Sequence, residues 1–92
     1  MSILTLSEAL QARRTLTAAG LTLVFTNGHF DLLHVGHLDY LEKARALGGA
    51  LFVGVNGDSA TESLKGTGRP IVPGHERARL IAALRPVDGV IL

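Results

Sequence analysis

Three of the four histidines in the chain lie within the twelve-residue segment TNGHFDLLHVGH (residues 26–37). His34 and His37 are spaced so that, on a helix beginning here, their Cβ atoms lie roughly 5–6 Å apart on one side. Two such imidazoles can donate hydrogen bonds to one phosphate group, and the first helical turn adds unpaired N–H groups and the positive end of the dipole. Gly28 and Gly36 keep side-chain bulk away, so a ligand can approach the backbone. The segment therefore predicts a phosphate-binding turn.

Other residues of this segment support a turn and leave two further interpretations open. Asn27 and Asp31 are short polar residues of the kind that tie turns together by hydrogen bonds. In one alternative, His34 and His37 are ordinary surface or capping histidines. In the other, these two and His29 supply three nitrogens to a metal ion, which we favour less because zinc sites normally take ligands from more than one element. We assign no metal ligands.

The chain before the histidine segment is predicted to form a helix and a strand. Thr5, with Glu8 as its partner, is a capping box that begins a helix over about residues 6–19, which Gly20 ends. The apolar run LTLVFT (21–26) is typical of a central strand covered on both faces in a parallel sheet. The histidine segment thus joins the end of this strand to the next helix.

The chain after the histidine segment alternates helices and strands. We first expect a helix that buries Leu38, Leu41, Ala44 and Leu47, followed by a central strand at ALFVGV (50–55). A short helix capped by Asp58 or Ser59 and a loop at KGTGRPIVPG (65–74) come next. The chain then continues with a helix over about 75–84, which buries Leu80, Ile81 and Leu84, and with a strand at DGVIL (88–92). This pattern predicts an α/β fold, a Rossmann-like open parallel sheet of three strands in the order 2-1-3 with helices on both faces. Because the chain ends on an apolar strand, we expect the last part of the domain to be missing, and an uncovered edge at GVIL indicates a homodimer.

The composition of the chain excludes several classes of protein. A chain of 92 residues makes a single domain (residues 1–92), and with no cysteine it has neither disulfides nor thiolate chemistry. No signal peptide or membrane-length apolar run is present, so we expect a cytoplasmic protein with no membrane partner. Residues 65–92 carry five Lys or Arg against two Asp or Glu, whereas residues 1–64 carry four against six. This bias favours an anionic ligand, without the basic and aromatic surface of a nucleic-acid-binding protein.

Four segments in order give a family resemblance. FTNGHFDLLHVGHLDYLEKARALG, VGVNGDS, LKGTGRPIVP and ERARLIAALRPVD resemble the H-x-G-H nucleotidyltransferase superfamily, the cytidylyltransferases and related adenylyltransferases, from about Leu23 to Leu92. They are most similar to the adenylyltransferase domain of bacterial ADP-heptose synthase. H-x-G-H alone also occurs in class I aminoacyl-tRNA synthetases, so the resemblance depends on finding all four segments in the right order.

The resemblance implies transfer of a nucleotidyl group from an NTP, ATP or CTP, to a phosphorylated small molecule, with release of pyrophosphate and with Mg²⁺ accompanying the NTP. Catalysis then consists of positioning and electrostatic stabilisation. The implied catalytic residues are His34, His37 and Lys65; the implied nucleotide-binding residues are Thr26, Asn27, Gly28, Phe30, Asp31, Gly36 and Arg77, with Asp31 also orienting the site and assisting Mg²⁺; and the implied substrate-binding residues are Asn56, Asp58 and Arg69.

Two departures from the family pattern keep alternatives open. His29 stands where relatives more often carry a small or apolar residue, and the family's second signature, a late segment rich in Ser and Thr, is not in this sequence. The favoured activity is adenylyl transfer to a sugar phosphate, as in ADP-heptose synthesis. The alternatives are cytidylyl transfer to glycerol 3-phosphate or a similar alcohol phosphate, and a relative that binds nucleotide without turnover.

Overall fold

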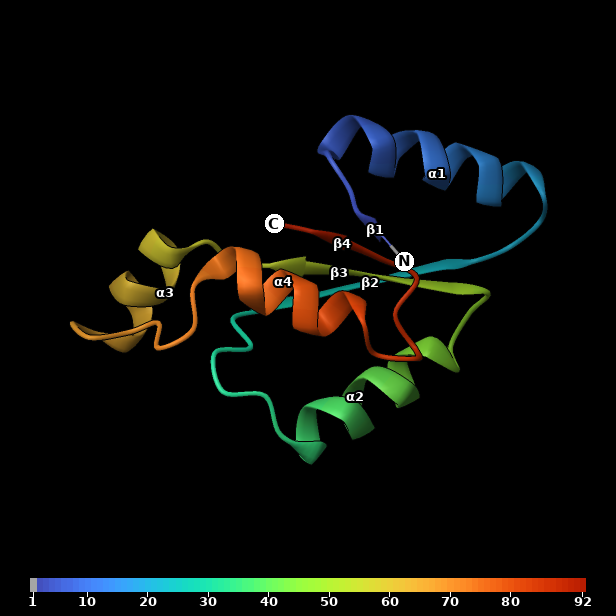
Figure 1. The fold of residues 1–92 in the computed structure, drawn as a ribbon. Helices are drawn as coiled ribbons and strands as arrows, with labels where there is room; N and C mark the ends of the chain where they lie inside the picture. Colours follow the sequence, from blue (N-terminus) through green and yellow to red (C-terminus); the bar gives the residue numbers. More distant parts are fainter. Residues whose placement is uncertain (1) are drawn as a thin grey trace.

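A computed structural model describes residues 2–92, which form four strands and four helices. Along the chain the elements are β1 (Ser2–Ile3), α1 (Leu6–Ala18), β2 (Leu23–Gly28), α2 (Val35–Arg45), β3 (Ala50–Val55), α3 (Asp58–Lys65), α4 (Gly74–Ala82) and β4 (Gly89–Ile91) (Figure 1). None of these helices is long and apolar enough to cross a membrane.

The four strands form one parallel sheet in the order β1-β4-β3-β2. From β2 through β3 to β4 the chain advances in one direction across the sheet, and from β1 to β2 it goes the opposite way. Because crossovers between parallel strands are right-handed, the helices of these two directions must lie on opposite faces. Figure 1 shows this arrangement, with α1 on one face and with α2 and α4 on the other. The predicted Rossmann-like open parallel sheet with helices on both faces is therefore confirmed.

The predicted strand order, 2-1-3, is wrong. The middle of the three predicted strands is β3, which pairs with β2 on one side and with β4 on the other. Five of its six residues are buried, whereas β2 pairs with β3 alone among the described residues and leaves Phe25 58% exposed. Both strands are apolar runs, and that property does not distinguish an edge from a centre.

The C-terminal strand is also placed differently from expectation. β4 lies inside the sheet, because β1, a two-residue strand too short to leave a sequence pattern, pairs with its outer side. Asp88 fixes β4 against β3: its N–H donates to the Leu51 carbonyl at 2.9 Å, and its carboxylate accepts from the Leu51 N–H at 2.8 Å. The open edge expected at GVIL is thus wrong, and the edge strands of the sheet in residues 2–92 are β1 and β2. The homodimer stays a prediction.

The core lies between the sheet and the pair α2 and α4. Its fully buried aliphatic residues are Leu41, Leu51, Val53, Ala78, Ile81 and Val90. Two predicted core positions are wrong: Leu47 is 76% exposed because α2 ends before it, and Leu80 is 50% exposed because it points away from the face that carries Ile81.

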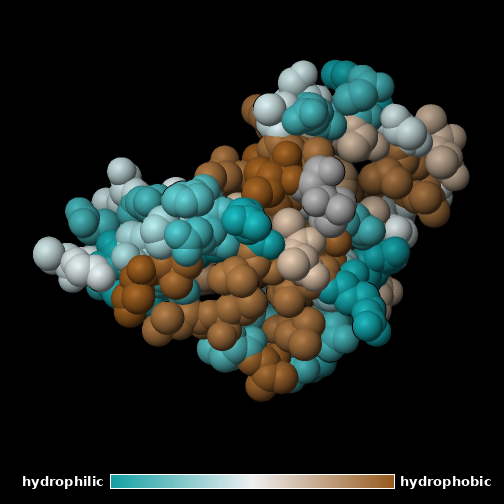
Figure 2. Space-filling model, in the orientation of Figure 1, coloured by the Kyte–Doolittle hydropathy of each residue, from teal (hydrophilic) through white to brown (hydrophobic). Residues whose placement is uncertain are grey.

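The opposite face of the sheet is covered less completely. The capping box of α1 is confirmed, since the Thr5 N–H donates to Glu8 at 2.9 Å and the Glu8 N–H donates to Thr5 Oγ1 at 3.1 Å. The only buried residue of α1, however, is Ala9. Figure 2 shows apolar residues gathered between α1 and the sheet, where a groove of about 270 Å³ is lined by Leu6, Ala9, Leu10, Arg13, Leu23, Phe25, Phe52 and Ile91.

Candidate active site

The candidate site lies at the carboxyl ends of β2 and β3. These strands are parallel and finish side by side, Gly28 opposite Val55, and the Asn56 N–H donates to the Gly28 carbonyl at 2.9 Å. The segments that follow them therefore meet at one edge of the sheet, which is where open α/β sheets bind ligands. The sequence prediction placed the phosphate-binding turn at this edge, and the loop between α3 and α4 also folds against it.

The two histidines of the motif cap α2 with their own rings. His34 is the N-cap residue, and its Nδ1 accepts from the Gly36 N–H at 3.0 Å. His37 Nδ1 accepts from the His34 N–H at 3.1 Å, and the ring centroids lie 4.1 Å apart. A nitrogen that accepts carries no proton, so each neutral ring has its proton on Nε2. Neither Nε2 has a hydrogen-bond partner among residues 2–92, which leaves two neighbouring N–H donors for a ligand.

The capping interpretation and the phosphate-binding interpretation are thus compatible, because they use different ring nitrogens. Burial lowers the pKa of His37, and the nearby charges of His34 and Lys65 lower it further. The neutral, Nε2-protonated form of His37 is therefore favoured near neutral pH. The charge of Lys65, at the end of α3, contributes to this shift, and a shared catalytic role of His34, His37 and Lys65 stays a prediction.

Both glycines of the turn are needed for its packing. A Cβ at Gly36 would lie 2.8 Å from His34 Cε1, so a side chain there would displace the capping ring. A Cβ at Gly28 would lie 2.9 Å from the ring of Phe30. Phe30 is buried, has a left-handed backbone with φ of 52°, and meets the His37 ring edge-on at 5.5 Å between centroids. Close approach of a ligand to either glycine stays a prediction.

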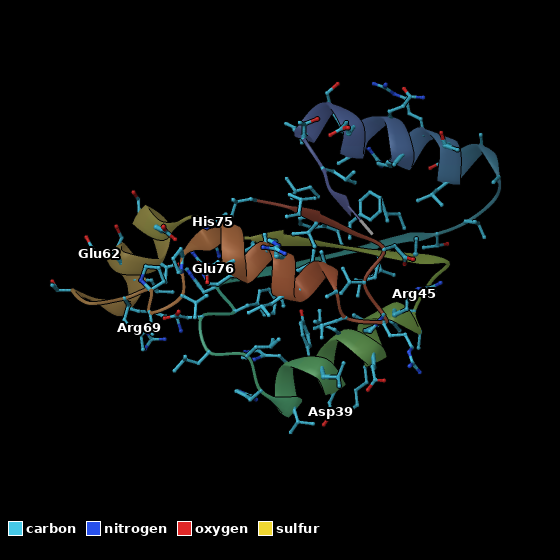
Figure 3. All side chains as sticks on the ribbon, in the orientation of Figure 1. Asp39, Arg45, Glu62, Arg69, His75 and Glu76 are labelled. Atoms are coloured by element: carbon cyan, nitrogen blue, oxygen red, sulfur yellow. The ribbon has the colours of Figure 1, made fainter. Side chains whose placement is uncertain are left out.

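Asp31 is buried and accepts hydrogen bonds from the loop between α3 and α4. Its carboxylate accepts from the N–H groups of Ile71 and Val72, each at 2.9 Å, and from Nε of Arg69. Burial by itself raises the pKa of this carboxyl, but the N–H groups of Val72 and Ile71 and the Arg69 guanidinium outweigh it and lower the pKa to about 2. Figure 3 shows Arg69 in that loop, and its side chain is 32% exposed.

Arg77 is fully buried and joins three segments of the edge. Its Nη1 donates to the carbonyls of His29 and Asn56, each at 2.7 Å, its Nε donates to the Val72 carbonyl at 2.8 Å, and its Nη2 donates to Asp58 Oδ1 at 2.7 Å. Four of the five N–H groups of the guanidinium are therefore used by the protein. A direct role of Arg77 in nucleotide binding stays a prediction.

The predicted substrate-binding residues belong partly to the same junction. Asn56 contributes its carbonyl to Arg77, and Asp58 accepts from both Arg77 and the Gly74 N–H, the latter at 2.8 Å. Asp58 is not the cap of α3, because Gly57 occupies that position. Of the three, Arg69 and Asp58 both keep a charged group partly exposed beyond their internal contacts, with side chains 32% and 58% exposed.

His29, the third histidine of the segment 26–37, contacts α3. His29 Nδ1 is 2.8 Å from Oγ1 of the buried Thr61, so its ring is held against α3. Within residues 2–92 no three His, Cys, Asp or Glu side chains are grouped as metal ligands would be. Of the remaining predicted residues, Thr26 is hydrogen-bonded to Tyr40, and Asn27 is exposed. Sequence reasoning missed Thr61 and Tyr40, whose positions carry no motif.

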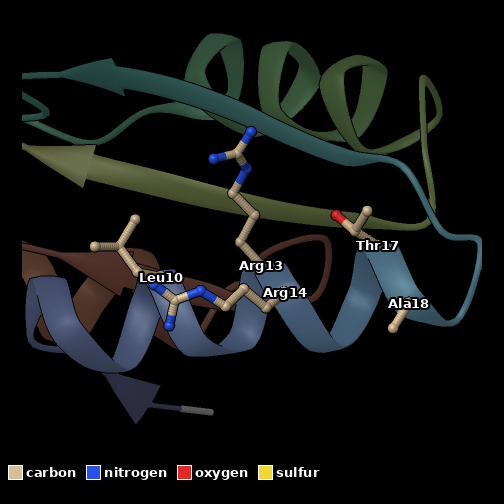
Figure 4. A pocket seen from close by; sticks show the side chains of 5 residues that line it. All are labelled: Leu10, Arg13, Arg14, Thr17 and Ala18. Carbon is tan, nitrogen blue, oxygen red and sulfur yellow. The ribbon is translucent and has the colours of Figure 1, made fainter.

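Surface hollows also occur away from this edge. Figure 4 shows one over α1, formed by a single helix and containing none of the predicted site residues; it is lined by Leu10, Arg13, Arg14, Thr17 and Ala18. The candidate site is therefore defined by the side chains that converge at the carboxyl edge.

Comparison with known proteins identifies the class to which this fold and edge belong. Residues 25–92 match the family described as cytidylyltransferase-like, and the chain belongs to this family. It is 52% identical to the bifunctional protein HldE of Methylococcus capsulatus over 88 residues, which are 96% of this chain and 19% of that protein. The HldE of Syntrophotalea carbinolica is 53% identical over 73 residues, 79% of this chain and 15% of that protein.

A solved structure supports the fold assignment. The lipopolysaccharide core biosynthesis protein from Thermoplasma volcanium superimposes with a TM-score of 0.74 at 38% identity, over 79% of this chain and 58% of that chain. The chain thus spans less than a fifth of the length of the two HldE proteins and somewhat over half of the solved relative.

Proposed function

We propose that the chain carries the nucleotide-binding turn of a nucleotidyltransferase, which transfers an adenylyl group from ATP to the phosphate of a sugar phosphate. An oxygen of the acceptor phosphate forms a bond to the α-phosphorus, the bond from that phosphorus to the bridging oxygen of the β-phosphate breaks, and pyrophosphate leaves. The observation that carries this proposal is the histidine pair, whose Nδ1 atoms are fixed by the helix cap and whose Nε2–H groups face outward as neighbouring donors. The HldE relatives and the lipopolysaccharide core biosynthesis protein support the choice of a sugar phosphate.

The physical task of such a site is to hold negative charge. Two polyanions meet, and charge accumulates on the oxygens around the α-phosphorus, so donors already in position stabilise the transition state without reorganising. His34 and His37 supply two such donors, and Lys65 adds a positive charge near them. The Nδ1 contacts hold the rings in place before the ligand arrives, which is the preorganisation that this form of catalysis requires.

Magnesium is expected to accompany the triphosphate and to neutralise part of its charge. The residues described here do not offer it a ready site: both oxygens of Asp31 accept hydrogen bonds from N–H groups, and no cluster of three potential ligands exists in residues 2–92. We therefore assign Mg²⁺ to the NTP as part of the substrate.

The test uses variants that keep the cap and remove the imidazole N–H. Asparagine is a favoured N-cap residue and glutamine a favoured third residue of a capping box, so His34→Asn and His37→Gln retain acceptors for the helix N–H groups. Each new amide has N–H groups of its own, but they are not held at the position of the imidazole Nε2–H. Each variant is expected to lower the rate of pyrophosphate release from ATP in the presence of an acceptor sugar phosphate by about 10²–10³. His75→Ala, which removes an exposed histidine at the start of α4, is the matched control and should leave the rate unchanged.

The outcomes separate the candidate functions. Wild-type rates in both histidine variants would reject the proposal. ATP binding by the wild-type chain in calorimetry, without product after long incubation, would support the nucleotide-binding relative. The match to a cytidylyltransferase-like family favours CTP as the second candidate, so greater thermal stabilisation by CTP than by ATP, each with Mg²⁺, would assign the chain to cytidylyl transfer to an alcohol phosphate.

A further inference from the structure

Three N–H donors contact the two oxygens of the Asp31 carboxylate. Oδ1 accepts from the N–H groups of Ile71 and Val72, and Oδ2 accepts from the Ile71 N–H, shared between the two oxygens, and from Arg69 Nε. An ionised carboxylate has about four lone-pair sites. Three donors on these sites and a side chain only 1% exposed leave the carboxylate little room for a metal ion while the loop stays in place.

These contacts connect two parts of the edge that are far apart in sequence. Asp31 follows β2 and lies in the turn that leads to His34, whereas its partners lie 38 to 41 residues later, in the loop between α3 and α4. Two other side chains hold this stretch among residues 2–92: Arg77 donates to the Val72 carbonyl, and Asp58 accepts from the Gly74 N–H. The loop between Lys65 and Arg77 is therefore held at its far end by Asp58 and by two buried charged groups.

The same contacts orient Arg69. Its Nε is committed to Asp31, while its terminal amino groups have no partner in the described part of the chain and its side chain is partly exposed. A guanidinium fixed at Nε presents its two terminal nitrogens as a pair, the geometry suited to two oxygens of one phosphate. The arrangement thus places a second anion-binding group beside the histidine turn.

We propose that Asp31 is a positioning residue, not a metal ligand: it latches the loop 69–72 to the histidine turn and so presents Arg69 to the phosphate of the acceptor. This inference rests on the proposed nucleotidyl transfer for its ligand, but the latch itself is a property of the free protein. A carboxylate stabilised by three N–H donors stays ionised over the whole range in which the enzyme would work, so the latch remains closed there.

The decisive variant is Asp31→Asn in the full chain, with Asp39→Asn, an exposed acid-to-amide change on α2 (Figure 3), as the matched control. Amide hydrogen exchange of Ile71 and Val72, measured by NMR without nucleotide, is expected to rise at least about tenfold in Asp31→Asn and to stay unchanged in Asp39→Asn. Unchanged protection of both amides in Asp31→Asn would overturn the latch. Arg69→Ala, which keeps the carboxylate, should raise the exchange of the same amides by less.

Two further measurements keep the inference testable if Asp31→Asn fails to fold. In the wild-type chain the amide shifts of Ile71 and Val72 should titrate together near pH 2, because they report the carboxylate that they contact; titration near pH 4 would contradict the latch. With ATP as probe, Arg69→Ala should raise the KM for the acceptor sugar phosphate about tenfold while the Mg²⁺ dependence of ATP binding stays that of the wild type. If the wild-type chain binds no ATP the proposed function fails, whereas the exchange result still decides the latch.

Discussion

The carboxyl edge of the sheet and the face beneath α1 hold their side chains in opposite ways. At the edge, Asp31, Thr61 and Arg77 are buried polar groups, and within residues 2–92 no buried side-chain polar atom lacks a hydrogen-bond partner. Beneath α1 the side chains are apolar but poorly covered, with Leu6 67% and Phe25 58% exposed. Directional contacts fix positions to within tenths of an ångström, whereas loose apolar contact does not. In this small domain the side chains with the most precisely fixed positions therefore lie at the edge where we propose the chemistry.

The largest expected effect is the loss of the buried guanidinium. Arg77→Met leaves the carbonyls of His29, Asn56 and Val72 without their donor, and we expect it to lower the free energy of unfolding by about 3 kcal/mol. Urea unfolding followed by circular dichroism measures this. Arg13→Met on the exposed surface of α1 is the control, and equal stabilities of the two variants would remove the contrast between the regions.

The second expected effect is the pH dependence that Asp31 contributes at the edge. The pKa of Asp31 is lowered to about 2 in the folded protein, against an ordinary value of 3.8, so the unfolded chain binds more protons between these values. The stability that Asp31 contributes is therefore fully present above about pH 4 and is lost as the pH falls towards 2.

Other carboxylates titrate in the same range, so the measured quantity is the difference between wild type and Asp31→Asn. Urea midpoints of the two proteins should lie well apart at pH 6 and converge as the pH is lowered below about 4. A difference that stays constant down to pH 2 would show that the ionised form of Asp31 contributes nothing to folding.

The smallest expected effect lies beneath α1. Leu6→Ala removes a side chain that is mostly exposed already, and we expect a change in stability within about 0.5 kcal/mol. Leu41→Ala, at a fully buried position of α2, is the matched comparison and should cost about 2–5 kcal/mol. A loss of several kcal/mol in Leu6→Ala would show that the α1 face is a second well-packed core, and the comparison would need to be revised.

Structural features that depend on neighbouring residues could be predicted from the sequence, whereas features that depend on residues distant in the chain could not. The capping box of Thr5 and Glu8 and the strand-to-helix turn at 26–37 are local, and both are confirmed. The strand order is wrong because it depends on the direction in which each crossover passes over the sheet. The short β1 was missed because two residues carry no pattern.

The candidate site shows the same division. Its place at the carboxyl end of the strands follows from topology and could be predicted, as could the spacing of His34 and His37. The partners of Arg77 could not, because three of them are backbone carbonyls from separate segments, and every residue type has a carbonyl. The capping contacts of the two histidines could be foreseen as one alternative, but not that capping and ligand binding use different ring nitrogens.

The position of Arg77 in the chain has a consequence for the order of events during synthesis. His29 leaves the ribosome 48 residues before the arginine that holds its carbonyl, and β2 and the histidine turn are complete well before α4 exists. A nascent chain that stops short of α4 carries the whole motif but lacks the group that locks its surroundings. Competence to bind ligand should therefore arise late and abruptly, when α4 docks.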